Sequence, residues 1–307
     1  MKVVFMGTPE FSVPTLNALI ESEHEVIGVV TQPDKPKGRG KKVSVTPIKE
    51  VALEHNIPVY QPKKVKDNEF VELIKELNPD VMVVIAFGQL LSKDLLEFPK
   101  WGCINVHASL LPRYRGAGPI QWAVINGEAE TGITTMHMDV GLDTGDMILK
   151  DSIKLDEKET AGSLHDKLSQ LGAITLIKTL KALEEGQAPR EQQNDEVATY
   201  APMLTKELGK IDWNKSAIEI ERLIRGLNPW PSAYTHLDNK FLKIWEADVV
   251  HSNEGAIGEI IQVTENEIIV QTKNEAIAIK ELQLEGKKRM KTKDFLRGYT
   301  INTGIRL

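Results

Sequence analysis

The sequence is poor in several features, and each shortage excludes a class of protein. A single cysteine, Cys103, occurs in 307 residues, so no internal disulfide can form, which agrees with a reducing compartment. No apolar run approaches the length of a membrane span, and residues 1–7 have the pattern of a first strand and not of a signal peptide. We therefore expect a cytoplasmic protein. We interpret Cys103 as a small buried core residue and not as a nucleophile.

Glycine is scarce in the first turn, where a nucleotide-binding fold would need it. Gly7-Thr8-Pro9 follows the first expected strand, as a dinucleotide fingerprint would. The turn lacks the second and third glycines of G-x-G-x-x-G, and Pro9 removes a backbone donor. A nicotinamide oxidoreductase is therefore a poor interpretation, and the turn either shapes a binding surface or only connects a strand to a helix.

Positive charge is in deficit overall, with a net charge of −6. Its distribution is more informative than its sum, because lysine and arginine gather in two short stretches. These stretches are Lys35, Lys37, Arg39, Lys41 and Lys42, and then Lys287, Lys288, Arg289, Lys291 and Lys293. Either cluster alone is typical of a solvated loop, yet local positive patches on an acidic protein can still hold a phosphate backbone.

The hydrophobic fraction of 41% and the charged fraction of 27% are those of a soluble globular protein, and the length suggests two domains. Residues 1–150 alternate between strand-like and helix-like segments. The expected strands are 2–6, 26–30, 81–86, 101–107 and 133–138, and the expected helices are 14–22, 46–55, 71–77 and 119–125. This rhythm predicts an α/β fold with a doubly wound, mostly parallel sheet.

A long helix over 160–185 is followed by a polar stretch with little apolar periodicity. We predict a catalytic domain over residues 1–189, a linker over 190–206 and a second domain over 207–307. In the second domain Ser216 and Glu219 form a capping box in front of a helix. Five short strands then follow, at 233–237, 241–246, 258–263, 267–272 and 276–282, which suits an OB-like β-barrel.

The candidate site lies at the end of one expected strand. Side chains alternate along a strand, so Asn105 and His107 point to the same face, at the carboxyl end where doubly wound sheets bind ligands. Asp143, on a glycine-bounded loop, is a carboxylate that can join them. An amide donor suits an oxyanion, an imidazole moves a proton, and a carboxylate orients the imidazole. The simpler interpretation is a pair of satisfied polar groups at a sheet edge.

A metal site is the other chemistry that these residue types suggest. The five candidate ligands are His107, His137, Asp139, Asp143 and Asp146. Their spacing matches no compact ligand motif, so we expect no metal.

The longer string Asn-x-His-x-Ser-Leu-Leu-Pro-x-x-Arg-Gly over 105–116, with Gly-x-Asp-Thr-Gly over 141–145, resembles the signature of the folate-dependent formyltransferases. The resemblance runs nearly end to end, through blocks such as 3–11, 31–36, 38–42 and 228–231. It implies a Rossmann-like formyltransferase domain and a tRNA-binding OB-like barrel. It also implies transfer of a formyl group from the cosubstrate 10-formyltetrahydrofolate to the amino group of methionine on initiator tRNA, for translation initiation. We expect a monomer.

By this resemblance Asn105 donates to the formyl oxygen, His107 accepts or relays the amine proton, and Asp143 holds His107. The implied folate contacts are Ile85, Ala86, Phe87, Gly88, Leu90, Ser109, Leu110, Leu111 and Pro112. The implied tRNA contacts are Lys35, Lys37, Arg39, Lys41, Lys42, Lys206, Lys287, Lys288 and Arg289. Arg39 would be wedged toward the first base pair of the acceptor stem. Arg113 and Arg115 either contact phosphate or the folate tail or are simply solvated.

Three alternatives remain open. A formyltransferase for a small amine, such as a sugar nucleotide or a purine precursor, would not need the basic loop at 33–43 or the barrel. A folate- or RNA-binding module without turnover would not need the complete set of Asn105, His107 and Asp143. A formyl-folate hydrolase would need a site that admits water in place of the amine.

Overall fold

A computed structural model describes residues 1–37 and 42–307, which form two compact units. Unit one comprises Met1–Gly116, Glu130–Lys154 and His165–Ala201, and unit two comprises Ala117–Ala129, Leu155–Leu164 and Pro202–Leu307. The chain therefore passes between the units more than once. Across the two described ranges, no helix has both the length and the apolar character needed to cross a membrane.

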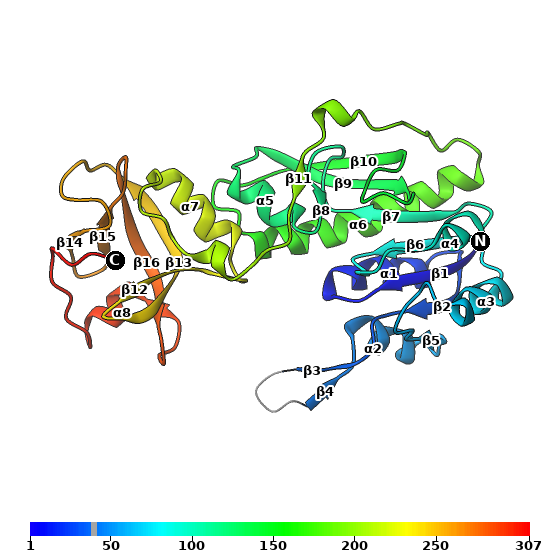
Figure 1. Cartoon of the computed structure of the whole chain (residues 1–307), viewed down its shortest axis with the longest axis horizontal. Helices are drawn as coiled ribbons and strands as arrows, with labels where there is room; N and C mark the ends of the chain where they lie inside the picture. The colour runs from blue at the N-terminus through cyan, green and yellow to red at the C-terminus, as the bar shows by residue number, and fades with distance from the viewer. Residues whose placement is uncertain (38–41) are drawn as a thin grey trace. The chain divides into compact units, whose positions relative to one another are not determined.

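Unit one is built on a seven-stranded sheet in the order β10-β9-β7-β6-β1-β2-β5 (Figure 1). The strands from β1 to β7 in this sheet pair in parallel, whereas β9 is antiparallel to both β7 and β10. Their bounds are β1 (Lys2–Gly7), β2 (Glu25–Val30), β5 (Val59–Tyr60), β6 (Val81–Ile85), β7 (Cys103–His107), β9 (Glu130–His137) and β10 (Met147–Lys154). The prediction of a mostly parallel, doubly wound sheet is confirmed.

Helices cover both faces of this sheet, which explains the continuous apolar run of β6, whose five residues are all buried. The helices are α1 (Val13–Glu21), α2 (Pro47–Glu54), α3 (Asn68–Leu77), α4 (Lys93–Glu97) and α6 (Ala161–Glu184). Side chains of α3 and α4 share one core cluster with Met82, Val84 and Cys103. On the other face α6 lies so close to the sheet that a Cβ on Gly172 would be 3.2 Å from Val106.

The strand order reverses between β1 and β6, and the loops at the carboxyl ends of these strands are tied together. Ser12 Oγ in the first turn donates to the backbone oxygen of Ile85 at 3.1 Å. Gly7 allows this approach, because a Cβ there would lie 2.9 Å from Ser12 Cβ. The first turn therefore uses its glycine for close packing between the strand ends.

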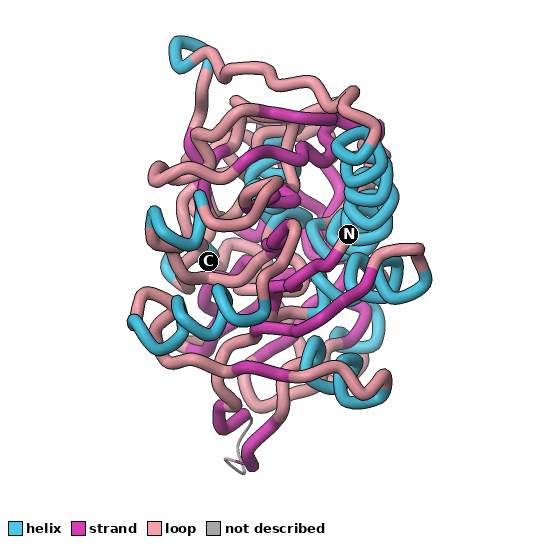
Figure 2. Tube along the Cα trace, turned by 90° about the vertical axis from the view of Figure 1, so that its right-hand side faces the viewer, coloured by secondary structure: helices cyan, strands magenta, loops and turns pink. Residues whose placement is uncertain are grey.

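A short hairpin, β3 (Lys35–Lys37) and β4 (Lys42–Ser44), carries the basic loop, and Figure 2 shows the two strands side by side. Its base is held by Asp34, which accepts from Lys49 Nζ at 2.6 Å and from Gln61 Nε2 at 2.7 Å. These bonds lower the pKa of Asp34, so the carboxylate stays charged. The predicted tRNA contacts Arg39 and Lys41 lie outside the described residues.

Unit two contains an antiparallel sheet in the order β12-β13-β16-β15-β14, with β17 paired to β16. The bounds are β12 (Ala233–Leu237), β13 (Lys240–Val250), β14 (Ile260–Val263), β15 (Ile268–Gln271), β16 (Ala276–Leu284) and β17 (Met290–Lys291). The sheet is barrel-like but not closed, because within the described residues no pairing joins β12 to β14. All five predicted strands of this region are present.

Three helices accompany this sheet: α5 (Pro119–Ile125), α7 (Ala217–Gly226) and α8 (Thr292–Leu296). The predicted capping box at the start of α7 is confirmed, with Ser216 Oγ accepting from Glu219 N and Ser216 N donating to Glu219 Oε2. The apolar face of α7, with Ile220 and Ile224, joins the core formed by the sheet. The helix therefore belongs to the hydrophobic core of unit two.

Two very short strands, β8 (Arg115–Gly116) and β11 (Tyr200–Ala201), pair in parallel within unit one. They join the loop after β7 to the polar stretch that follows α6. Three single turns of 3₁₀ helix complete the described elements, at Glu10–Ser12, Asp195–Val197 and Glu207–Gly209. The β8–β11 pairing matters below, because it brings the stretch 190–201 onto the candidate site.

Candidate active site

One carboxylate contacts both strand-borne side chains of the candidate trio. Asn105 Nδ2 donates to Asp143 Oδ1 at 3.4 Å, and His107 Nδ1 lies 3.7 Å from Asp143 Oδ2. Asn105 and His107 share the face of β7 on which Cys103 packs into the core, as the alternation of a strand requires. The structure therefore brings the three predicted side chains together.

The two ring nitrogens of His107 have different surroundings. Nε2 lies 2.9 Å from the backbone oxygen of Tyr114. A carbonyl only accepts, so we assign the proton of the neutral ring to Nε2. Nδ1 is then the nitrogen that takes up a second proton, and it does so facing the carboxylate of Asp143. His107 is only 6% exposed, so this charge pair is shielded from bulk water.

The loop that carries Asp143 is shaped by its own polar groups. Asp139 Oδ1 accepts from Gly141 N at 2.9 Å and from Thr144 Oγ1 at 2.7 Å. Asp143 has a left-handed backbone with φ of 55°, and its Oδ2 accepts from Gly116 N at 2.8 Å. A Cβ on Gly145 would lie 1.7 Å from the backbone oxygen of His137, so only glycine fits there.

Gln193 is a residue of the site that sequence reasoning missed. It is 7% exposed and lies in the polar stretch predicted to begin the linker. Its Nε2 donates to the backbone oxygens of Asp143 and Gly145, both at 2.8 Å, and its Oε1 accepts from Arg115 Nε at 2.9 Å. The sequence places Gln193 between Gln192 and Asn194 in a polar stretch, and such a stretch gives no sign of burial.

The predicted folate contacts after β6 divide into buried and exposed positions. Ile85 and Phe87 are core residues, 0% and 3% exposed, so their side chains face away from any ligand. Phe87 offers only its backbone, and its oxygen already accepts from Gln32 Nε2 at 3.1 Å. Ala86 and Gly88 are exposed with positive φ, of 47° and 82°, and Leu90 is 55% exposed.

The predicted folate contacts after β7 form a tight turn. Ser109 is buried, and its Oγ donates to the oxygen of Arg113 at 2.7 Å. Thr134 Oγ1 donates to the oxygen of Ser109 and accepts from Leu111 N. Leu111 is buried as well, whereas Leu110 and Pro112 are half-buried. Surface for a ligand is therefore provided by Leu110 and Pro112.

Two further apolar side chains flank the candidate trio and were not singled out from the sequence. Val140 is 75% exposed and Leu142 is 48% exposed, both on the Asp143 loop. Large apolar side chains held outward on a loop beside polar groups are typical of the wall of a ligand site. The signal in the sequence was two apolar residues inside an otherwise acidic and glycine-rich loop.

The remaining charged candidates near the trio are occupied by protein partners. Arg115 Nη2 donates to Asp195 Oδ1 at 2.7 Å, so Arg115 ties two loops together in addition to holding Gln193. The guanidinium of Arg113 lies 5.3 Å from the ring of Tyr114. Asp146 accepts from Arg190 Nε at 2.6 Å, and Asp139 braces its own loop. Among the residues that the structure describes, no three side chains form a metal-binding group.

Cys103 is a core residue, as predicted. It is 1% exposed, and its Sγ donates to the backbone oxygen of Leu95 at 3.3 Å. Burial raises the pKa of the thiol to about 12, so the thiolate needed for nucleophilic attack is not formed near neutral pH.

Some of the predicted RNA-contacting residues are exposed, and others are already bonded to other protein residues. Lys35, Lys206, Lys287 and Lys288 are exposed. Arg289 instead forms two hydrogen bonds to Glu281, at 2.8 and 2.9 Å, and its guanidinium lies 4.5 Å from the ring of Trp245. The backbones of Lys37 and Lys42 are register partners in the β3–β4 hairpin. Arg289 is thus already bound within unit two, whereas the exposed lysines are available to a phosphate backbone.

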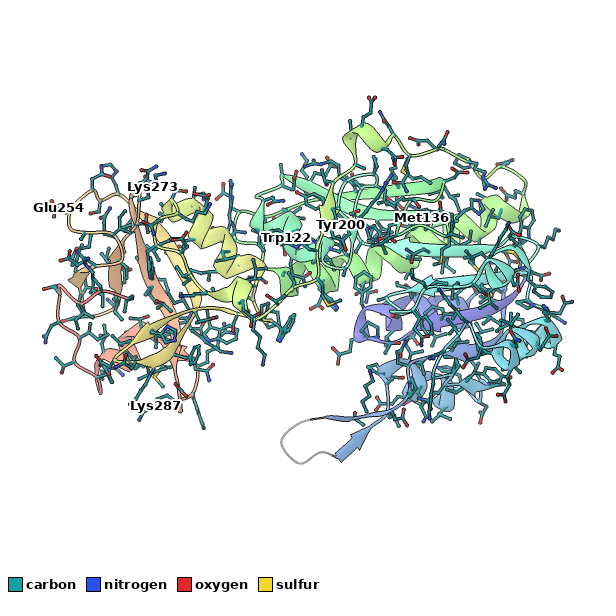
Figure 3. The ribbon with its side chains drawn as sticks, viewed as in Figure 1. Trp122, Met136, Tyr200, Glu254, Lys273 and Lys287 are labelled. Atoms are coloured by element: carbon teal, nitrogen blue, oxygen red, sulfur yellow. The ribbon has the colours of Figure 1, made fainter. Side chains whose placement is uncertain are left out.

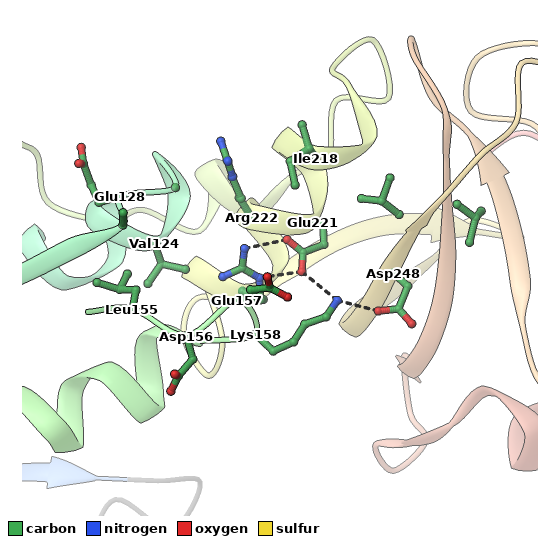
Figure 4. Close-up of a pocket in the computed structure, with 15 residues that line it drawn as sticks. Val124, Glu128, Leu155, Asp156, Glu157, Lys158, Ile218, Glu221, Arg222 and Asp248 are labelled. Atoms are coloured by element: carbon green, nitrogen blue, oxygen red, sulfur yellow. Dashed lines mark hydrogen bonds and ion pairs between the residues drawn. The ribbon is translucent and has the colours of Figure 1, made fainter. Parts of the chain in front are cut away.

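A cavity of about 750 Å³ lies within unit two and does not contain the trio (Figure 4). Its charged walls neutralise one another: Glu221 pairs with Arg225 at 2.7 Å and with Lys158 at 3.5 Å, and Lys158 pairs with Asp248 at 2.7 Å. These ion pairs explain how the carboxylate of Glu221 can be buried, with only 4% of the residue exposed. The cavity has the character of an ion-pair network and not of a catalytic site.

Comparison with known families agrees with this geometry. A family model described as "Formyl transferase" matches residues 1–180, and a second, described as "Formyl transferase, C-terminal domain", matches residues 203–300. The chain therefore belongs to the formyl transferase family, and the family named from its motifs is confirmed. The first match covers the whole trio.

Curated relatives extend the likeness over the full chain. The chain is 56% identical over 306 residues to a methionyl-tRNA formyltransferase of Clostridioides difficile (strain 630), covering 99% of both chains. It is 57% identical over 305 residues to one of Agathobacter rectalis, covering 99% of this chain and 98% of that protein.

Solved structures share the fold at low sequence identity. An N-formyltransferase from Helicobacter canadensis, in complex with folinic acid and dTDP-3-aminofucose, has a TM-score of 0.69 at 19% identity, covering 91% of this chain and 98% of that one. HypX from Aquifex aeolicus, in complex with tetrahydrofolic acid, has a TM-score of 0.65 at 15% identity, covering 100% of this chain and 51% of that one.

Proposed function

We propose that the chain transfers the formyl group of 10-formyltetrahydrofolate to the amino group of methionine on initiator tRNA, giving formylmethionyl-tRNA for translation initiation. The observation that carries the proposal is the single carboxylate of Asp143, which contacts both Asn105 and His107. The near-complete length shared with methionyl-tRNA formyltransferases supports the choice of acceptor.

In the proposed reaction the neutral amine attacks the formyl carbon, and a new C–N bond forms as the carbonyl oxygen gains negative charge. Asn105 Nδ2 donates to that oxygen. The Nδ1 atom of His107 takes up the proton that the amine loses, because Nε2 is held by the oxygen of Tyr114. Asp143 stabilises the resulting imidazolium. The bond from the formyl carbon to the folate nitrogen then breaks, and the proton held by His107 passes to that nitrogen as tetrahydrofolate leaves.

The proposed folate site uses the exposed part of the predicted set. Ala86, Gly88 and Leu90 on the loop after β6 and Leu110 and Pro112 after β7 offer surface to a flat heterocycle. Val140 and Leu142 add apolar wall beside Asp143. The buried members, Ile85, Phe87, Ser109 and Leu111, act by shaping the two loops. These side chains fit an aromatic cosubstrate better than a charged one.

The proposed tRNA contacts lie on the basic hairpin of unit one and, separately, on exposed lysines of unit two. The residues are Lys35, Lys37, Arg39, Lys41, Lys42, Lys206, Lys287 and Lys288, with Arg289 reduced to a supporting role by its bond to Glu281. Charge of this kind binds phosphate without reading sequence. The proposal further assigns residues 1–189 to catalysis, 190–206 to the linker and 207–307 to tRNA binding, in a monomeric cytoplasmic enzyme.

The experiment that tests this function is single-turnover formylation of methionine-charged initiator tRNA by the wild-type protein and by Asn105→Ala. Loss of one oxyanion donor costs on the order of 10²- to 10³-fold in rate, whereas folate and tRNA binding should be retained. Asn68→Ala, which changes an exposed asparagine of α3, is the matched control and should react like the wild type. A rate for Asn105→Ala within about threefold of the control would refute the assigned oxyanion role.

A further inference from the structure

The buried amide of Gln193 connects three segments of unit one. It reaches the Asp143 loop through two carbonyl oxygens and the loop after β7 through Arg115. Its own segment, residues 190–201, is the third. Figure 3 labels Met136, whose sulfur lies 3.9 Å from Gln193 Nε2, and Tyr200, which packs against Gly116.

The amide of Gln193 is satisfied in a way that no other side chain reproduces. Two N–H groups meet two backbone oxygens, and the carbonyl oxygen meets a guanidinium N–H. The loop oxygens of Asp143 and Gly145 need donors, because unpaired buried carbonyls cost free energy. Methionine has the same length but no donor, and glutamate keeps the acceptor but presents negative charge to both carbonyls.

The segment that presents Gln193 is itself fastened on both sides. On one side Glu191 and Met147 exchange two backbone hydrogen bonds, at 2.8 and 2.9 Å, and Arg190 pairs with Asp146. On the other side Tyr200–Ala201 pairs with Arg115–Gly116. Gly116 N in turn donates to Asp143 Oδ2. Gln193 therefore stands between two anchors, both of which touch the loop that carries Asp143.

We infer that Gln193 is a positioning residue for the formyl transfer proposed above. It holds the backbone at Asp143 and Gly145, and so fixes where the Asp143 carboxylate meets Asn105 and His107. The contacts at 3.4 and 3.7 Å leave little tolerance, because a shift of the loop by 1 Å separates the carboxylate from both partners. Gln193 acts through Asp143 and does not touch the substrates.

The test compares Gln193→Met and Gln193→Glu with the matched control Gln192→Met, which changes the exposed neighbouring glutamine. We expect kcat for formyl transfer to fall by about 10- to 100-fold in both Gln193 variants, with KM for folate and for tRNA within twofold of the wild type. Gln192→Met should match the wild type throughout.

The Gln193→Glu variant separates loop positioning from general packing. It retains an acceptor for Arg115 and loses both donors to the Asp143 loop, so the inference predicts that it is as slow as Gln193→Met. If Gln193→Glu keeps wild-type kcat, the bond to Arg115 is the one that matters and the inference is overturned. The inference is also overturned if Gln192→Met loses as much kcat and melting temperature as the Gln193 variants do.

Amide hydrogen exchange of residues 139–146 provides a readout that does not depend on activity. Exchange should accelerate by about tenfold or more in both Gln193 variants and stay unchanged in Gln192→Met. Unchanged exchange in the Gln193 variants would contradict the inference even if formyl transfer is confirmed. If exchange is faster in the Gln193 variants but the wild-type protein transfers no formyl group to tRNA, the positioning role of Gln193 is supported and the proposed function is refuted.

Discussion

At the scale of single residues, the site depends on which atom of each side chain is free. His107 has one nitrogen held by the oxygen of Tyr114 and one facing Asp143, so the direction of proton uptake follows from a backbone contact. Arg115 and Arg289 are both bound by carboxylates, which limits what they offer to a ligand. Residue type alone therefore does not determine a role.

Cys103 gives a residue-scale prediction about reactivity. Because burial raises its thiol pKa to about 12, the native protein should not react with iodoacetamide at pH 8, whereas the unfolded protein should take up one equivalent. Cys103→Ala should keep kcat within about twofold and lose roughly 1 to 2 kcal/mol of unfolding free energy. Mass spectrometry and urea titration measure the two effects. Rapid alkylation of the native protein would contradict the assigned burial.

Residues of the site were predictable from the sequence where a local period or a motif located them. Alternation along a strand placed Asn105 and His107 on one face, and the glycine-bounded loop identified Asp143. Tyr114 and Gln193 were not predictable in this way. Their contributions are a backbone oxygen and a buried amide, and the partners of such groups are set by tertiary packing and not by a repeating pattern.

At the scale of elements, the sequence predicted helices and strands well where the hydrophobic period was strong. It predicted short or highly charged elements poorly. The helix at 119–125 was predicted with the bounds that α5 has, and the long helix at 160–185 differs from α6 by one residue at each end. β10 was missed, because Lys150, Asp151 and Lys154 interrupt its apolar pattern. Such charges suit an edge strand, where they oppose pairing with another chain.

The capping box of α7 gives an element-scale prediction. Ser216→Ala removes the acceptor for Glu219 N and should cost about 1 kcal/mol of unfolding free energy, measured by urea titration with circular dichroism. Glu219→Gln retains a side chain able to reach back to Ser216 N and should lose less. If Ser216→Ala has the unfolding free energy of the wild type, the capping bond does not stabilise the start of α7.

Two histidines of unit one predict how stability depends on pH. Burial lowers the pKa of His24 and of His137 below the ordinary value of 6.5, and at His137 the charge of Arg190 adds to the effect. The unfolded chain then binds more protons than the native one near pH 6, so unfolding free energy should fall as the pH drops through about 6.5. Carboxylates with lowered pKa act at more acidic pH, so this window isolates the histidines.

Urea titrations at pH 7.5 and pH 5.5 measure this difference. His24→Gln combined with His137→Gln should reduce the loss of stability between the two pH values, whereas His55→Gln, at the end of α2, should leave it unchanged. A loss of equal size in the double variant and the wild type would contradict the assignment.

At the scale of the whole molecule, the chain combines a doubly wound sheet that carries the trio with an antiparallel sheet that carries exposed lysines. Each unit draws on separated stretches of sequence, because residues 117–129 and 155–164 belong to unit two. Composition along the chain locates a polar stretch, but it does not show which segments return to which core. The contact pattern in space decides that, and it is not encoded in any local period.

Formyl transfer across a panel of acceptors tests the central claim most directly. The wild-type protein and 10-formyltetrahydrofolate are mixed with methionine-charged initiator tRNA, charged elongator tRNA, free methionine or buffer alone, and both formylated product and released tetrahydrofolate are quantified. We predict rapid formylation of the initiator tRNA, one tetrahydrofolate released per formyl group transferred, and negligible turnover in buffer. Folate turnover without formylated tRNA would contradict the account and point to a hydrolase or a small-amine acceptor.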